Sequence, residues 1–194
     1  MNTELVKATE SATAEVSRAG GANEDMWVIG RYRMECVGAD GEVKWIEEFD
    51  NLVVNVGKSD LLQKYFSGSA YTAAWYLGLV DGGTAPTYNA ADTMASHATW
   101  TELAGGVTYT GNRPAPTWNA ATGTGGGAGS AGTGSKSTTA TSFAIIASAT
   151  VAGAFLNTAA TGTAGTLFSA GSFTGGNRAV INGDTLNVTY TVNC

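Results

Sequence analysis

Alternation of apolar and polar residues predicts a chain built mainly from β-strands. The clearest example is residues 184–192, in which Leu186, Val188, Tyr190 and Val192 alternate with polar residues. A period of two places every second side chain on the same face of a strand, so we expect one face to be buried. The other runs that we expect to contribute strands are residues 27–37, 43–49, 73–80, 142–147, 151–156 and 166–173.

The first two runs predict a β-hairpin. Within residues 27–37, Tyr32, Met34 and Cys36 alternate with charged residues. Residues 39–42 then supply turn chemistry, with a glycine that tolerates a positive φ. The return strand is expected at residues 43–49.

One short helix is expected, at about residues 59–67. Ser59 and Asp60 are suitable N-caps, and Gly68 is a suitable stop. Apolar side chains recur at helical spacing between them, and we expect this stripe to pack against the core. The residues of the stripe are Leu61, Leu62, Tyr65 and Phe66.

Two segments are too poor in large apolar residues to build a core. Residues 1–25 predict an extended acidic N-terminal arm, which contains too little apolar surface to fold alone. Residues 112–136 predict a long Gly-rich surface loop. We therefore expect one all-β domain at residues 26–194, a β-sandwich or jelly roll with a single short helix.

Charge is scarce and unevenly placed. Residues 1–50 hold eleven acidic and five basic residues, which is the whole net charge of −6, and charged residues make up only 13% of the chain. We expect neighbouring subunits to cover much of the nearly neutral body, because net charge normally keeps a free surface soluble. The alternative is a Thr-rich and Ser-rich surface that hydroxyl groups solvate.

Composition also argues against several classes of protein. No apolar run approaches the roughly 18 residues of a membrane span, and the acidic N-terminus does not resemble a signal peptide. The basic residues are too scattered for a nucleic-acid surface. Two cysteines cannot form a disulfide framework, and a single histidine does not suggest a metal centre.

The candidate catalytic motifs are weak. Residues 129–137 resemble a phosphate-binding loop, but Ser135 separates the second glycine from Lys136, so the spacing is wrong. Ser96 and His97 are adjacent and would point to opposite faces of an extended chain, so we expect His97 to bond loop carbonyls. We therefore predict no catalytic residue and no cofactor.

Two groups of acidic residues need a separate interpretation. Glu47 and Glu48 lie in a short acidic run that we expect to form a solvated face or to meet a basic partner. A calcium site that uses Asp81, Asp92 or Asp184 is left open, although these residues lack the regular spacing of a calcium loop.

The aromatic residues are the better candidates for binding. Five tryptophans are spread through the chain, and Trp118 stands between two prolines and the Gly-rich segment. Trp118 is predicted either to anchor an interface or to fold back as a lid on its own sandwich.

A family resemblance rests on three groups of short strings. The first is DNLVVNVG at residues 50–57 with YTAAWYLGLV at 71–80. The second is ADTMASH at residues 91–97, followed by WTE at 100–102 and RPA at 113–115. The third is GAFL at residues 153–156, GTLFSAG at 165–171 and GDTLNV at 183–188. Together they resemble the capsid cement, or decoration, proteins of short-tailed bacteriophages across residues 26–194.

The resemblance implies a structural subunit of the virion without enzymatic activity. It would form dimers or trimers on the outer surface of the head and bridge major capsid proteins, with residues 91–97 as a fixed loop. We expect the interface to include Trp27, Arg113, Trp118, Glu47 and Glu48. The alternatives are a tail or portal-vertex component, and a module that binds glycans on the host surface through exposed Trp and Tyr rings.

Overall fold

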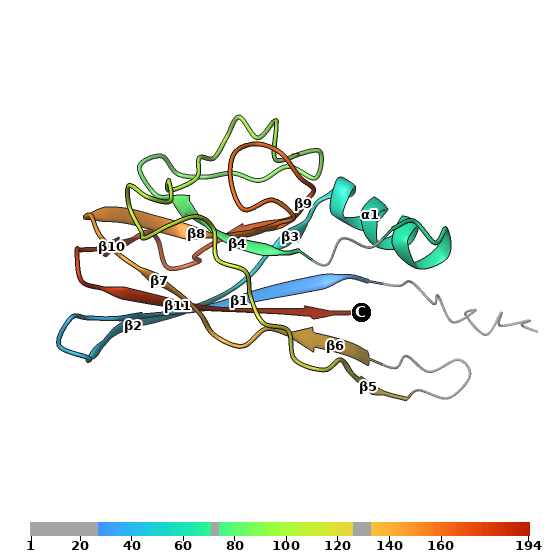
Figure 1. Ribbon diagram of the computed structural model, residues 1–194, viewed down its shortest axis with the longest axis horizontal. Coiled ribbons are helices and arrows are strands. Elements are labelled where there is room, and N and C mark those ends of the chain that lie inside the picture. Colours follow the sequence, from blue (N-terminus) through green and yellow to red (C-terminus); the bar gives the residue numbers. More distant parts are fainter. Residues whose placement is uncertain (1–26, 71–73, 126–132) are drawn as a thin grey trace, which may run out of the picture.

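The computed structural model describes residues 27–70, 74–125 and 133–194 (Figure 1), and the predicted arm at residues 1–25 lies outside these residues. Two antiparallel sheets face each other, which confirms the predicted all-β sandwich. The first sheet has the strand order β2-β1-β11-β6-β5, and β7 also pairs with β11. Its strands are β1 (Ile29–Val37), β2 (Val43–Asp50), β5 (Thr122–Thr124), β6 (Thr133–Ser137), β7 (Thr141–Ala144) and β11 (Thr185–Asn193).

The second sheet has the order β10-β8-β9-β3, and β4 also pairs with β8. Its strands are β3 (Leu52–Val53), β4 (Tyr76–Asp81), β8 (Ala149–Asn157), β9 (Leu167–Ser172) and β10 (Arg178–Val180). The hairpin predicted at the start of the domain is β1–β2, in which Gly41 has a φ of 84° as the turn requires.

The main core lies between the two sheets. β1 and β11 contribute directly opposed pairs, among them Tyr32 with Tyr190 and Met34 with Val188. All four side chains are fully buried, as the alternation along these strands predicted. The Tyr32 hydroxyl lies 2.9 Å from the Ser169 Oγ on β9, so a polar contact also joins the two sheets.

A second core covers the outer face of the second sheet. Met94 and Trp100, from the long connection after β4, pack with Phe155 of β8 and Leu167 of β9. The second sheet is therefore buried on both faces, which explains why its strands are continuous apolar runs and not alternating ones.

The helix differs from its prediction in position and in packing. α1 spans Asn55–Phe66, and Val54 caps it without a side-chain hydrogen bond. Gly57 lies closest to the sheet, where an added Cβ would stand 2.5 Å from the Phe168 carbonyl oxygen. The prediction of a buried apolar stripe is wrong, because Leu61, Leu62, Tyr65 and Phe66 are all exposed.

The predicted loop at residues 112–136 also needs correction. Its described part contains β5 and β6, and β6 pairs with β11 through Ser137 opposite Thr191. Gly, Thr and Ser extend the sheet here through backbone hydrogen bonds, which need no apolar side chain. Residues 126–132, the centre of the predicted loop, lie outside the described residues.

The close approach of β8 and β9 gives a first testable prediction. A Cβ on Gly153 would stand 2.0 Å from the Gly171 carbonyl oxygen. Gly153→Ala should therefore lower the free energy of unfolding by about 1–3 kcal/mol, as overpacking typically does. In the matched control Gly123→Ala on β5, the nearest atom would lie at 3.9 Å. Equal urea midpoints for the two variants would contradict this prediction.

Candidate interaction surface

Large apolar side chains are exposed together at one end of the sandwich. Trp27 is 69% exposed, Tyr65 79% and Phe66 72%. Ile29 and Leu62 are exposed beside them in the chain, and we call these five residues the end surface. Figure 1 shows α1 and the beginning of β1 at the same end of the molecule.

A groove runs between α1 and the first sheet at this end. It consists of three hollows of about 170, 230 and 310 Å³, and Leu61 and Phe168 line all three. Trp75 stands edge-on to Phe168 with a ring separation of 5.5 Å. Other residues that line these hollows include Val28, Lys64, Trp118, Lys136, Val192 and Cys194.

Of the five residues expected at the interface, Trp27 lies in the end surface, and Trp118 lies in the wall of the groove. Trp118 is half-buried and stands edge-on to Tyr190, with ring centroids 6.2 Å apart. Lys136 Nζ lies over the Trp118 ring, 5.9 Å from its centre. Trp118 therefore packs back onto its own sandwich, as the lid interpretation expects, and its part in an interface stays a prediction.

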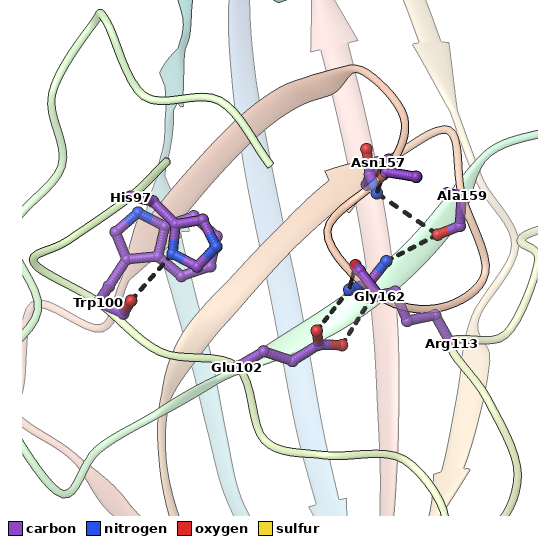
Figure 2. A network of polar contacts seen from close by, with 8 residues as sticks. His97, Trp100, Glu102, Arg113, Asn157, Ala159 and Gly162 are labelled. Atoms are coloured by element: carbon purple, nitrogen blue, oxygen red, sulfur yellow. Dashed lines mark hydrogen bonds and ion pairs between the residues drawn. The ribbon is translucent and has the colours of Figure 1, made fainter. Parts of the chain in front are cut away.

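Arg113 is buried and holds loops together (Figure 2). Its Nε donates to Glu102 Oε1 at 2.6 Å, and its other nitrogens donate to the carbonyl oxygens of Ala159 and Gly162 at 2.8 and 2.7 Å. The guanidinium also lies 5.2 Å from the centre of the Phe155 ring. Arg113 therefore holds the β4–β5 connection and the β8–β9 loop together beside the second sheet.

Glu47 and Glu48 both meet basic residues of their own chain. Glu48 Oε2 lies 3.0 Å from an Arg31 nitrogen, and Glu48 Oε1 lies 3.7 Å from Arg33 Nε. Glu47 pairs with Arg178 on β10 and so links the two sheets at their edge. The cations that these acidic residues were expected to meet on a partner are present within the chain.

His97 occupies the structural position that was predicted for it. Its Nδ1 donates to the Trp100 carbonyl oxygen at 2.9 Å, and its ring stacks on the Trp100 ring at 3.8 Å (Figure 2). The loop before it is closed by paired backbone hydrogen bonds between Thr93 and Ser96.

The three aspartates considered for calcium serve separate local contacts. Asp81 accepts from the Gly83 amide, and Asp92 accepts from Trp100 Nε1. Among the described residues, no three or more His, Cys, Asp or Glu side chains are grouped closely enough to hold a metal ion.

Asp184 is the most deeply buried of these carboxylates. It accepts hydrogen bonds from Lys44 Nζ at 2.7 Å and from the Ile181 amide at 3.0 Å, and it receives a weaker contact from the Cys36 thiol. Burial alone would raise the pKa of Asp184, but the hydrogen bonds outweigh it and hold the pKa below 3.8. In the sequence, only one feature pointed to a special role for Asp184: it is one of just four charged residues after Leu103.

The sequence did not reveal that the apolar stripe of α1 is exposed on the surface. Helical spacing shows that Leu61, Tyr65 and Phe66 share one side of α1, but it does not say whether that side meets the core. The deciding feature is Gly57, where the helix backbone meets β9, so that only the first part of α1 packs closely on the sheet and the later residues stay exposed.

No family model, no curated protein and no solved structure matches the chain. Within the described residues, no helix has the length and apolar character needed to cross a membrane.

The second prediction concerns acid stability. Because the pKa of Asp184 is lowered in the folded state, its ionised form stabilises the protein above the ordinary carboxyl pKa, near 3.8. This contribution is lost as the pH falls below that value through the lowered pKa. Asp184→Asn should therefore lose stability at neutral pH and flatten the pH dependence below pH 4. The control is Glu42→Gln, which removes an exposed carboxylate from the β1–β2 turn and should keep the wild-type loss of stability below pH 4 in urea titrations at each pH.

Proposed function

We propose that this protein is a virion structural protein, a capsid cement or decoration protein of a tailed bacteriophage. It binds the outer surface of the head and bridges major capsid proteins. The observation that carries the proposal is the end surface, with three exposed aromatic rings and two exposed aliphatic side chains on α1 and at the start of the first sheet. Exposed aromatic side chains are common in binding sites for other proteins.

The charge pattern supports the same function. Six basic residues of the described chain form ion pairs with carboxylates of the same chain. Specific contact with a partner then depends mainly on apolar surface and hydroxyl groups. The resemblance of residues 26–194 to cement proteins points the same way and adds a jelly-roll topology and assembly as dimers or trimers.

Stabilisation of a head by this protein follows from mass action. A subunit that binds the expanded capsid lattice better than the unexpanded one shifts the equilibrium towards the expanded form. An interface of about 800 Å² per partner is enough when many copies act together. No catalytic step and no cofactor is required.

A glycan-binding module on the virion is the second candidate. Trp27 and Tyr65 are more than two-thirds exposed, and exposed rings of this kind can stack on sugars. Binding of the purified protein to host cells, abolished by replacement of both rings, would favour this function over the cement role.

The third prediction tests the cement role on heads that lack the protein. Purified wild-type protein added back should co-sediment with the heads and raise the temperature at which they release DNA. Phe66→Ser should weaken this binding about 10- to 30-fold, the loss typical of an aromatic residue at the centre of an interface. Val107→Ser is the matched control, since Val107 is 67% exposed but lies outside the end surface.

Two outcomes would contradict the cement role. The first is that complete heads and heads without the protein release DNA at the same temperature. The second is a copy number of about six or twelve per virion by quantitative mass spectrometry, which would indicate a tail or portal-vertex component.

A further inference from the structure

A polar hollow of about 180 Å³ opens between the β4–β5 connection and the β8–β9 loop. It shares no lining residue with the apolar groove. The contacts of Arg113 with Glu102 and with the β8–β9 loop form one part of its wall (Figure 2). The other lining residues used below are Gly105, Tyr109, Asn112 and Thr161.

The hydroxyl of Tyr109 has no hydrogen-bond partner among the described residues, although the side chain is only 1% exposed. An edge contact with Phe143, with ring centroids 4.9 Å apart, fixes the ring. The hydroxyl end of the ring lies at the wall of the hollow, because a Cβ on Gly105 would stand 3.2 Å from Tyr109 Cζ. Buried polar groups are normally hydrogen-bonded, so this hydroxyl indicates a ligand that supplies a partner.

The hydroxyl can both donate and accept a hydrogen bond. Burial, and then the charge of Glu102, raises the pKa of Tyr109 well above its ordinary value, and the charge of Arg113 lowers it. The phenol therefore keeps its proton at neutral pH.

Arg113 does not require an anionic ligand. Its guanidinium donates four hydrogen bonds, two to the Glu102 carboxylate and two to backbone carbonyl oxygens. The carboxylate also balances its charge. Each oxygen of Glu102 accepts one of these bonds and keeps the capacity to accept another, and the side chain is 21% exposed. The wall therefore favours a neutral ligand that can donate to Glu102.

The rim adds further polar groups. Asn112 and Thr161 are exposed, and neither side chain makes a hydrogen bond within the described residues. Because the Tyr109 hydroxyl is covered, entry of a ligand requires a small displacement of this rim. Side chains that no hydrogen bond holds can move in this way.

The ligand must both donate to Glu102 and accept from Tyr109, and hydroxyl groups do both. A volume of 180 Å³ corresponds to roughly six water molecules, so the ligand is one small ring and is smaller than a typical drug. We propose that this hollow binds a single neutral sugar residue of a glycan. The inference does not depend on the cement role, and it places the sugar away from Trp27 and Tyr65.

The experiment titrates the full-length protein with the methyl glycosides of glucose, galactose, mannose and N-acetylglucosamine, followed by ligand-observed NMR. At least one should bind with a Kd of roughly 1 mM, as expected for a ligand of about 13 non-hydrogen atoms at ordinary ligand efficiency. Inorganic phosphate and acetate should neither bind nor compete, because the charges in the hollow are balanced.

Tyr109→Phe, which removes only the hydroxyl, locates the site. It should weaken binding of the glycoside about 3- to 10-fold, the loss expected for one hydrogen bond. Its urea midpoint should not fall, because the hydroxyl has no protein partner to lose. The matched control is Tyr88→Phe, which removes a buried hydroxyl outside the hollow and should leave the affinity unchanged.

Each of the other outcomes overturns the proposal. Failure of all four glycosides to bind would show that the hollow is not a sugar site. Unchanged affinity in Tyr109→Phe, or loss of binding in Trp27→Ser, would place the sugar elsewhere. A lower urea midpoint for Tyr109→Phe would show that the hydroxyl already has a partner, and binding of phosphate would contradict the neutral class. These measurements need no phage heads, so they leave the cement role to its own test.

Discussion

The structure depends on the pairing of β1 with β11. The two strands match residue for residue from Ile29 opposite Asn193 to Val37 opposite Thr185. This antiparallel ladder forms the centre of the first sheet and joins the beginning of the domain to its end. It places Tyr32 and Tyr190 side by side in the core, with ring centroids 4.7 Å apart. It also brings Val28 and Cys194, which flank the ladder, to the same groove.

Charge in this fold serves mainly to fasten parts of the chain to one another. Glu47 with Arg178 links the two sheets, Arg113 with Glu102 joins two parts of the β4–β5 connection, and Asp184 with Lys44 ties the β1–β2 hairpin to the residue before β11. Removing one partner of a buried pair leaves an uncompensated charge, so such a change is expected to destabilise the fold.

Sequence periodicity predicted the strands that bury one face, because alternation such as that from Tyr32 to Cys36 follows directly from the pleat. It failed for β5 and β6, whose Gly, Thr and Ser residues carry no apolar signal. It also misplaced the start of α1, since Val54 is not a typical cap. The partners of Arg113 lie as far as 49 residues away in the chain, at Gly162, so no local pattern reveals them.

The end surface and the groove differ in shape. The groove is concave, and its walls include Leu61 of α1 and Phe168 of β9. Tyr65 and Phe66 stand edge to face on α1, with ring centroids 5.0 Å apart, and both project outward. Rings that project need a concave partner. The proposed cement role therefore calls for a capsid surface with a hollow that is complementary to these two rings.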